Sequence, residues 1–438
     1  MSPRYKPRLS SQAIISFIDA HTFTILAGIA TLAIVLNIAI LIDQPPIFNY
    51  GETGHWWPLI QNLVNGHGYV LCEPEYFPFC NPSNEITATR EPVPVLFFTA
   101  IAWLSNQSLL VAAVFEAGIH LAILFIVFLL ARSLANTRAA LLASLLWTVY
   151  LPGLELVPQV SGDLLACLFL ALGIFFIMRS RQTGRWRDWL IAGAAFGLAA
   201  LSRTVVLAVL LPLVIGLVWE GWAAAGKKWS GVIRRMWPSL VIVVIVVIMM
   251  APWIIRNQLA FRTPVIGTTL SGYNLYRHNH IIDRANDFRY VTGEEAQQAV
   301  QDLLVRQTNL TGTENEAQMD KVYLGAALKL ITAYPLRYLE LSLWRFLPLW
   351  FDWQINEAYG VRTPHLDYYE MIVQGLFLVL ALVATWKTWK NSWPLWSSIV
   401  IYSLAYMAVV GQLRYIVGVM PLVLALSAAG CQHLTRKK

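Results

Sequence analysis

Long apolar runs, separated by short polar segments, dominate the chain from one end to the other. Runs of about 20 residues recur, which is the length that an α-helix needs to cross about 30 Å of hydrocarbon. The pattern predicts an all-α fold, a polytopic transmembrane helical bundle of about 10 spans and at most about 12. We expect residues 1–438 to form a single membrane domain. The predicted spans are 22–43, 108–131, 137–152, 160–178, 188–202, 204–222, 237–255, 368–386, 392–410 and 415–432.

Two polar regions interrupt this pattern, at 44–107 and at 256–367. In the first, Trp56–Leu63 is typical of a helix that lies in the membrane interface, where Trp is enriched. The sequence Asn65-Gly66-His67-Gly68 supplies residues that tolerate left-handed conformations and should end this helix. The run Val95–Leu104 predicts a second interfacial helix, because it is too short to span the bilayer.

The second polar region predicts two kinds of helix. Residues Glu294–Leu330 have the amphipathic character of soluble helices. Residues Leu336–Phe351 include Arg337, Glu340 and Arg345, so we interpret this run as interfacial rather than membrane-spanning.

The distribution of charged residues indicates how the chain is oriented in the membrane. Only 13% of residues are charged, against about 25% in soluble domains. Lys and Arg are concentrated in one alternating set of connections, whereas the other set, with the long segment 256–367 set aside, holds only Arg90, Arg203 and Arg414. By the positive-inside rule both termini are cytoplasmic and the two long polar regions extracytoplasmic. The net charge of +7 does not indicate nucleic-acid binding, because it is spread over many short loops. We find no cleavage pattern before the first span, which fits a bacterial inner membrane.

The cysteines divide between two environments. Cys72 and Cys80 lie in the first extracytoplasmic loop, where an oxidising compartment would allow a small disulfide, and the sequence leaves open whether it forms. Cys167 and Cys431 lie within spans and are interpreted as packing residues.

Glu116 and His120 lie inside the second span, four residues apart and therefore on one face. A carboxylate at this depth is costly unless it is paired or faces water. Two interpretations remain open: a mutual hydrogen bond that fixes helix packing, or a polar cavity that opens outward.

The predicted outer face combines two sets of side chains whose chemistry is complementary. Carboxylates accept protons or hold a metal, and Arg forms paired hydrogen bonds to phosphate without losing its charge. Such a surface beside a bilayer suits an amphipathic substrate with a phosphate head and a lipid tail. The acidic residues are Glu52, Glu155 and Asp163, and the basic ones are Arg90, Arg203, Arg256 and Arg414.

The first loop has an acidic residue, an aromatic, an apolar residue, a Leu and Gly-x-Gly-aromatic, then Arg-x-Pro-x-Pro. The residues of this series are Glu52, Trp56, Ile60, Leu63, Gly66, Gly68, Tyr69, Arg90, Pro92 and Pro94. Later in the chain come Pro252, Trp253, Arg256, Asn257, Gly272, Asn274, Asn279, Arg414, Tyr415 and Pro421. Together these motifs resemble those of the GT-C superfamily of integral membrane glycosyltransferases, in particular the branch of protein O-mannosyltransferases and lipid A aminoarabinose transferases (glycosyltransferase family 39-like). Glu52 replaces the usual Asp, and Arg277-His278 replace small residues.

The resemblance implies inverting transfer of a sugar from a polyprenyl-phosphate carrier to a lipid, glycan or protein acceptor on the extracytoplasmic face. We expect Glu52 to be the general base, with Asp163 as a second catalytic carboxylate. The expected substrate and phosphate ligands are Arg90, Arg203, Arg256, Arg414, Tyr415, Asn274 and Asn279.

Some relatives use a metal and others do not. If a metal is bound, oxygen ligands from Glu52 and Asp163 would suit Mg²⁺ or Mn²⁺. A non-catalytic polyprenyl-lipid-binding or envelope-assembly protein is the alternative function, because it could keep the same residues. A transporter is disfavoured, since the chain shows neither internal symmetry nor paired broken helices.

Overall fold

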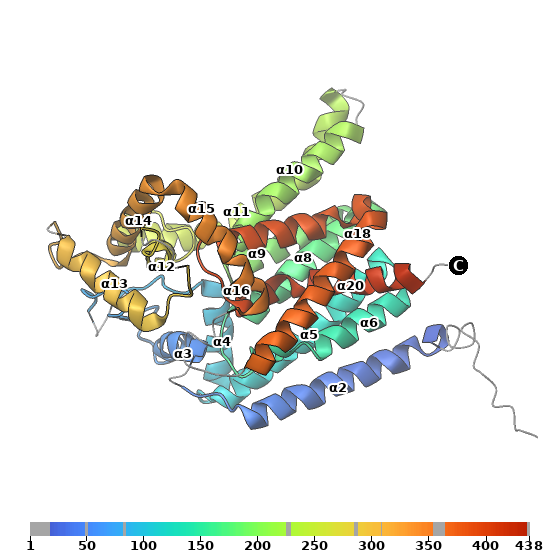
Figure 1. The fold of residues 1–438 in the computed structure, drawn as a ribbon, viewed down its shortest axis with the longest axis horizontal. Helices are drawn as coiled ribbons and strands as arrows, with labels where there is room; N and C mark the ends of the chain where they lie inside the picture. The colour runs from blue at the N-terminus through green and yellow to red at the C-terminus, as the bar shows by residue number, and fades with distance from the viewer. Residues whose placement is uncertain are drawn as a thin grey trace, which may run out of the picture.

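The computed structural model describes residues 18–48, 51–81, 85–224, 229–283, 288–307, 309–353 and 364–435. Within these ranges the chain is helical, and β pairing is limited to one bridge between Val70 and Ile86. Seven of the described segments are helical, long and apolar enough to cross a bilayer. They are α2 (Thr22–Asp43), α5 (Leu109–Leu134), α8 (Asp163–Thr183), α10 (Val206–Ala224), α11 (Trp229–Phe261), the part Tyr368–Trp386 of α18 (Pro364–Met407), and the run Leu413–Gln432. The fold is therefore that of a polytopic helical membrane protein (Figure 1).

Three shorter helical segments lie where the remaining predicted spans, 137–152, 188–202 and 392–410, were placed. Two are α6 (Thr137–Thr148) and α9 (Trp186–Ala200), which pack in the same bundle. The third is the last part of α18, which folds back on the first part, because Trp396 Nε1 donates to Thr385 Oγ1. Eleven residues of straight α-helix would separate these two positions by about 16 Å. Figure 1 shows the two legs of α18 meeting near its label.

Helix burial explains why the C-terminal residues lie close to the loop at 44–107, which is predicted to be extracytoplasmic and is called the first outer loop below. The C-terminal run Leu413–Gln432 is 89% buried, whereas the apolar window of α2 is only 17% buried. This run comprises α19 (Leu413–Ile416), a 3₁₀ turn (Val417–Val419) and most of α20 (Met420–Thr435). Gly430 allows α20 to approach α18 closely, because a Cβ there would lie 2.0 Å from the Leu380 carbonyl oxygen. Arg414 lies in α19, directly before this buried helix.

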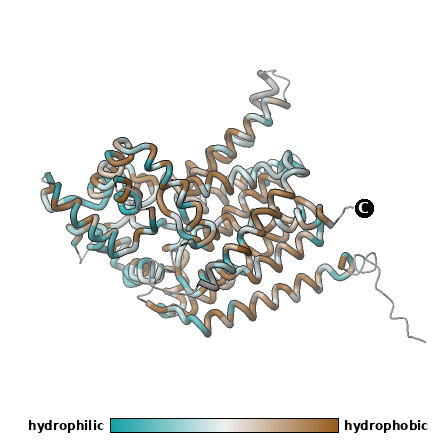
Figure 2. The backbone as a smooth tube through the Cα atoms, viewed as in Figure 1, coloured by the Kyte–Doolittle hydropathy of each residue, from teal (hydrophilic) through white to brown (hydrophobic). Residues whose placement is uncertain are grey.

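The helices between residues 271 and 351 form a layer at one end of the bundle, called the outer layer below after its predicted position (Figure 1). In Figure 2 the bundle helices are mostly apolar, whereas polar residues are frequent on this layer. The described ends of the chain, at α2 and α20, lie at the opposite end of the bundle. The helices of the layer are α12 (Ser271–Asn279), α13 (Gly293–Arg306), α14 (Glu316–Ala333), α15 (Pro335–Trp344) and α16 (Phe346–Phe351).

Helices α13 and α14 confirm the helical character predicted for 294–330. The expected single helix over 336–351 is wrong, because the chain breaks at Arg345. The buried Arg345 guanidinium donates to backbone carbonyls of His278 and Met407. It therefore ties the outer layer to the end of α18.

The first outer loop contains the two expected short helices, α3 (Gly51–Val64) and α4 (Pro92–Leu104). Gly66 and Gly68 follow α3 with φ of +80° and +91°, which glycine adopts at little cost. A disulfide between Cys72 and Cys80 closes the loop between the helices, so the predicted option of a disulfide is confirmed.

Glu116 and His120 do not bond to each other as one interpretation expected. Glu116 Oε1 accepts from the Ser161 amide at 3.2 Å, and His120 Nδ1 lies 3.2 Å from Asn37 Nδ2. Both side chains are fully buried, and neither lines the outer cavity described below. Glu116 instead holds the chain just before α8, which begins at Asp163.

Candidate functional site

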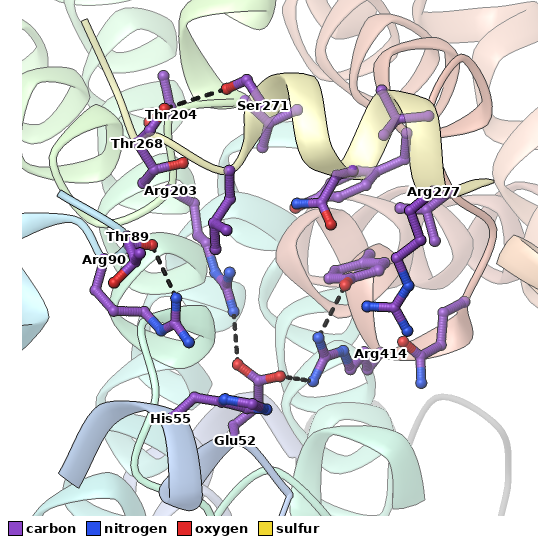
Figure 3. Close-up of a pocket in the computed structure, with 18 of the residues that line it drawn as sticks. Glu52, His55, Thr89, Arg90, Arg203, Thr204, Thr268, Ser271, Arg277 and Arg414 are labelled. Carbon is purple, nitrogen blue, oxygen red and sulfur yellow. Dashed lines mark hydrogen bonds and ion pairs between the residues drawn. The ribbon is translucent and has the colours of Figure 1, made fainter. Parts of the chain in front are cut away.

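A cavity of about 670 Å³ lies between the outer end of the bundle and the outer layer (Figure 3). Four segments that are distant in sequence form its walls: the start of α3 with residues 89–91, the turn at 203–205, residues 268–278 with Tyr290, and residues 405–415. Six charged side chains line it, namely Glu52, Arg90, Glu91, Arg203, Arg277 and Arg414. Four of the six are guanidiniums and two are carboxylates.

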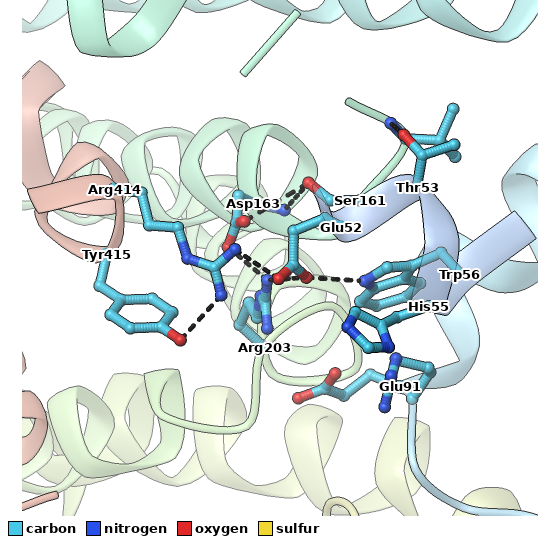
Figure 4. Close-up of polar contacts among 12 residues, drawn as sticks. Glu52, Thr53, His55, Trp56, Glu91, Ser161, Asp163, Arg203, Arg414 and Tyr415 are labelled. Atoms are coloured by element: carbon cyan, nitrogen blue, oxygen red, sulfur yellow. Dashed lines mark hydrogen bonds and ion pairs between the residues drawn. The ribbon is translucent and has the colours of Figure 1, made fainter. Parts of the chain in front are cut away.

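Glu52 lies at the centre of this charge cluster, in the first turn of α3 (Figure 4). Its Oε1 accepts from Arg414 Nη1, and its Oε2 accepts from Trp56 Nε1 at 3.1 Å. Arg203 Nη2 lies 3.7 Å from Oε2. The side chain is 14% exposed, so it is held by three partners but still faces the cavity.

The same arginines determine the protonation of Glu52. Burial by itself raises the pKa of this carboxyl, but the charges of Arg414 and Arg203 outweigh it and hold the pKa well below its usual range. Glu52 is therefore an ionised, weakly basic carboxylate as long as both guanidiniums face it.

Arg203 joins Glu52 to Asp163. Arg203 Nη2 lies 2.7 Å from Asp163 Oδ1, and the Ser161 hydroxyl also bonds to the Asp163 carboxylate. Asp163 opens α8, where a carboxylate also complements the helix dipole. Asp163 bonds to Arg203 but does not itself line the cavity.

Arg90 lines the cavity but has a counter-ion of its own. Its guanidinium donates to Glu73 Oε1 at 2.8 Å and to the Thr89 carbonyl at 3.0 Å. Glu73 also lies 3.3 Å from His55 Nδ1. Burial raises the pKa of Glu73, but the Arg90 charge outweighs it and lowers the pKa. Arg90 is thus neutralised within the first loop.

Two of the expected ligands lie outside the cavity. Arg256 donates to the carbonyls of Thr87 at 2.7 Å and Tyr69 at 3.2 Å, so it fixes the first loop onto the end of α11. Asn279 accepts from Arg345 at 2.9 Å and donates to the Leu275 carbonyl. The hydrogen bonds of both side chains are thus made to other parts of the protein. By contrast, Asn274 and Tyr415 line the cavity, and Arg414 donates to the Tyr415 hydroxyl at 2.8 Å.

Arg277 is a cavity residue that sequence reasoning treated only as a departure from the family pattern. It projects from α12 beside Arg414 (Figure 3). Among the described residues no carboxylate forms an ion pair with it, and its Nε is buried without an acceptor. Its three-residue spacing from Asn274 places both on one helix face, which is the signal that could have identified it.

The carboxylates fit guanidinium partners better than a divalent cation. Glu52 and Asp163 face Arg203, whose positive charge occupies the space between them. No group of three or more His, Cys, Asp or Glu that could bind a metal occurs among the described residues. Binding of Mg²⁺ or Mn²⁺ by Glu52 and Asp163 stays a prediction, because one or two carboxylates together with a substrate phosphate commonly hold Mg²⁺.

Comparison with known proteins gives one family match. The model of the dolichyl-phosphate-mannose-protein mannosyltransferase family matches residues 89–255. These residues include the Arg90 motif, Asp163 and Arg203. A comparison with curated protein sequences finds no match.

Solved structures share the fold at low sequence identity. The oligosaccharyltransferase AglB from Archaeoglobus fulgidus, in complex with an inhibitory peptide and a dolichol-phosphate, has a TM-score of 0.55 at 15% identity, over 96% of this chain and 52% of that one. The same enzyme tethered to an acceptor peptide has a TM-score of 0.51 at 15% identity, over 96% and 51%. The chain therefore spans about half the length of the oligosaccharyltransferase chains it matches. The family match over residues 89–255 and the shared fold make this chain similar to integral membrane glycosyltransferases of the GT-C superfamily.

Proposed function

We propose that this protein transfers a glycosyl group from a polyprenyl-phosphate carrier to a hydroxyl acceptor on the extracytoplasmic face of a bacterial inner membrane, with inversion. The observation that carries the proposal is the Glu52 carboxylate facing a cavity together with Arg203, Arg277 and Arg414. The dolichol-phosphate bound to the Archaeoglobus oligosaccharyltransferase supports a lipid phosphate as the carrier.

The reaction requires one base and one anion-stabilising group. The acceptor oxygen attacks the anomeric carbon of the sugar while Glu52 accepts the hydroxyl proton. The bond between the anomeric carbon and the phosphate oxygen breaks, and its electron pair leaves with the polyprenyl phosphate. Guanidiniums that are already in place stabilise the charge that grows on this leaving group.

Donor binding also strengthens the base in this proposal. In the free protein Arg414 and Arg203 hold the pKa of Glu52 low, after the opposing effect of burial. A phosphate that shares these guanidiniums weakens their pull on Glu52, so its affinity for a proton rises only when the donor is present. The acceptor is thereby activated next to a bound donor rather than in an empty cavity.

Arg277 is the residue best suited to meet the phosphate first. Arg90 and Arg203 already have carboxylate partners in Glu73 and Asp163, whereas Arg277 has none among the described residues. A phosphodiester can therefore pair with Arg277 without breaking an existing ion pair.

The test is release of polyprenyl phosphate by purified protein in lipid nanodiscs. The probes are undecaprenyl-phosphate-linked hexoses and pentoses, supplied with a membrane extract as the source of acceptors. We expect Glu52→Gln to lower turnover by at least about 10²-fold, the usual contribution of a general base. Glu75→Gln is the matched control, because Glu75 is an exposed carboxylate of the same loop.

Two outcomes would contradict the proposal in different ways. Wild-type turnover in Glu52→Gln would remove Glu52 from the mechanism. Tight binding of the lipid-linked sugars without release by the wild type would favour the alternative of a non-catalytic polyprenyl-lipid-binding protein.

A further inference from the structure

One face of α14 contacts three segments that line the cavity. Glu316, Asp320 and Tyr323 are spaced four and three residues apart, so they project from the same side of the helix. Glu316 and Tyr323 bond to two parts of the first loop, and Asp320 bonds to α12. Helix α14 itself contributes no residue to the cavity lining.

Glu316 joins the first outer loop to the second outer segment. Its Oε2 accepts from the Ala88 amide and from the Thr269 hydroxyl, both at 2.8 Å. The Thr269 amide also donates to the Ala88 carbonyl at 3.0 Å. Thr89 and Arg90 directly follow Ala88 and line the cavity, and the carboxyl is 1% exposed. Glu316 and this backbone bond therefore join two walls of the cavity.

Asp320 holds the third wall. Its Oδ1 accepts from the amides of Gly272 at 2.6 Å and Tyr273 at 3.1 Å, which lie in the first turn of α12 and need an acceptor. Helix α12 carries Arg277 into the cavity. Gly272 makes the contact close, since a Cβ there would lie 2.1 Å from the Asp320 carbonyl oxygen.

The hydroxyl of Tyr323 completes the set by donating to the Tyr76 carbonyl at 2.9 Å. Tyr76 also lines the cavity. The contacts of α14 thus reach the first loop twice and α12 once, and no other described helix bonds to all of these segments through its side chains.

We propose that Glu316 and Asp320 are positioning residues, which hold the Arg90 loop and α12 together so that Arg90 and Arg277 face the same ligand. The inference rests on the proposed function in one respect: the ligand is taken to be the lipid-linked donor. The docking of α14 itself can be measured without any ligand.

The surroundings of both carboxyls make this docking depend on pH. Burial raises the pKa of Glu316 to about 7, against the hydrogen bonds from Ala88, Thr87 and Thr269, and the nearby Glu73 adds to the rise. Burial also raises the pKa of Asp320 to about 7, against its two amide bonds. The other titratable groups near Glu316 are Arg256 and Tyr69, and Tyr323 lies near Asp320. No Lys or Arg among the described residues forms an ion pair with either carboxyl.

Proton linkage determines whether the docking of α14 strengthens or weakens as the pH changes. A carboxyl with a raised pKa in the docked state binds its proton more tightly there than in the undocked state, so docking strengthens as the pH falls. With a docked pKa near 7 and an ordinary pKa when undocked, the docking equilibrium changes by about tenfold per carboxyl between pH 8 and pH 6.

Hydrogen–deuterium exchange tests the docking directly. We expect protection of residues 85–90 and 271–276, corrected for intrinsic exchange, to rise by about tenfold per carboxyl from pH 8 to pH 6. Glu316→Gln should abolish the pH dependence at 85–90, and Asp320→Asn that at 271–276, because both variants keep an acceptor without a charge. Glu294→Gln, an exposed carboxyl on α13, should behave like the wild type. Protection that is the same at both pH values in the wild type would overturn the inference.

Binding of undecaprenyl phosphate to protein in nanodiscs tests the positioning role. The affinity of the wild type divided by that of the double variant E316Q/D320N should fall as the pH rises from 6 to 8. Taking this ratio cancels the titration of the lipid phosphate itself. A constant ratio would overturn the positioning role while leaving the proposed function intact. Failure of every protein to bind the lipid at any pH would instead overturn the proposed function, and the positioning role with it.

Discussion

Gly162 lies where four parts of the site meet, so Gly162→Ala is a sharp test of their packing. A Cβ at this position would lie 2.7 Å from the Ser202 carbonyl oxygen, 3.0 Å from Pro94 Cγ and 3.1 Å from the Trp56 ring. Ser202 precedes Arg203, and Gly162 precedes Asp163. The added methyl group therefore pushes apart the two residues that form the 2.7 Å ion pair.

The size of both effects follows from the contact between the added Cβ and the Ser202 carbonyl oxygen. Carbon–oxygen contacts are comfortable at about 3.3 Å or more, so the Ser202 carbonyl must move by about 0.6 Å. Overpacking of this kind costs about 1–3 kcal/mol of stability. A displacement approaching 1 Å of a positioned side chain can lower turnover by about 10²-fold, so we expect a loss of about ten- to hundredfold.

Thermal unfolding in detergent, followed by tryptophan fluorescence, and turnover in nanodiscs would measure the two effects. Gly118→Ala is the matched control, because a Cβ at Gly118 meets nothing within 4 Å. In a helix interior that change should be neutral or stabilising by up to about 1 kcal/mol. If Gly162→Ala were as stable and as active as Gly118→Ala, the close packing of α8 against the 202–203 turn would be refuted.

Two further predictions concern the charged residues of the cavity. Arg277→Gln should weaken binding of undecaprenyl phosphate by about ten- to hundredfold, as expected for the loss of a charged hydrogen bond, and Arg277→Lys should recover part of the affinity. Arg306→Gln is the control. If Arg277→Gln bound the lipid as tightly as Arg306→Gln, Arg277 would be excluded as a phosphate ligand. Because its pKa is held low, Glu52 contributes stability that is fully present above pH of about 4.5 and is lost as the pH falls further. The difference in melting temperature between wild type and Glu52→Gln should therefore shrink from pH 7 to pH 3.5. A constant difference would show that Arg203 and Arg414 do not control the pKa of this carboxyl.

The membrane bundle could be predicted because the thickness of the bilayer imposes a length on each span. The shorter helices α6 and α9 were placed by the same pattern, although each is too short to cross on its own. The break at Arg345 could not be predicted, since it depends on carbonyls of His278 and Met407 that are remote in sequence.

The charge cluster was partly predictable because three of its members are the basic residues of short outer connections. Arg203 and Arg414 are two of them, and both reach Glu52. Arg256 belongs to the same family motif set but bonds to backbone carbonyls of the first loop, and no local pattern distinguishes these two uses of an Arg. The contacts of α14 could not be predicted either, because an amphipathic pattern does not specify which groups its buried carboxyls will bond to.

The partners Glu52 and Arg414 are 362 residues apart, and this separation has a consequence for biogenesis. During synthesis the N-terminal helices enter the bilayer long before the C-terminal ones emerge from the ribosome. A partly made chain thus presents an acidic loop without its principal guanidinium, and the cavity lacks a wall. The pairing of Glu52 with Arg414, and with it the cavity wall at residues 405–415, therefore forms only after the segment 413–432 has inserted.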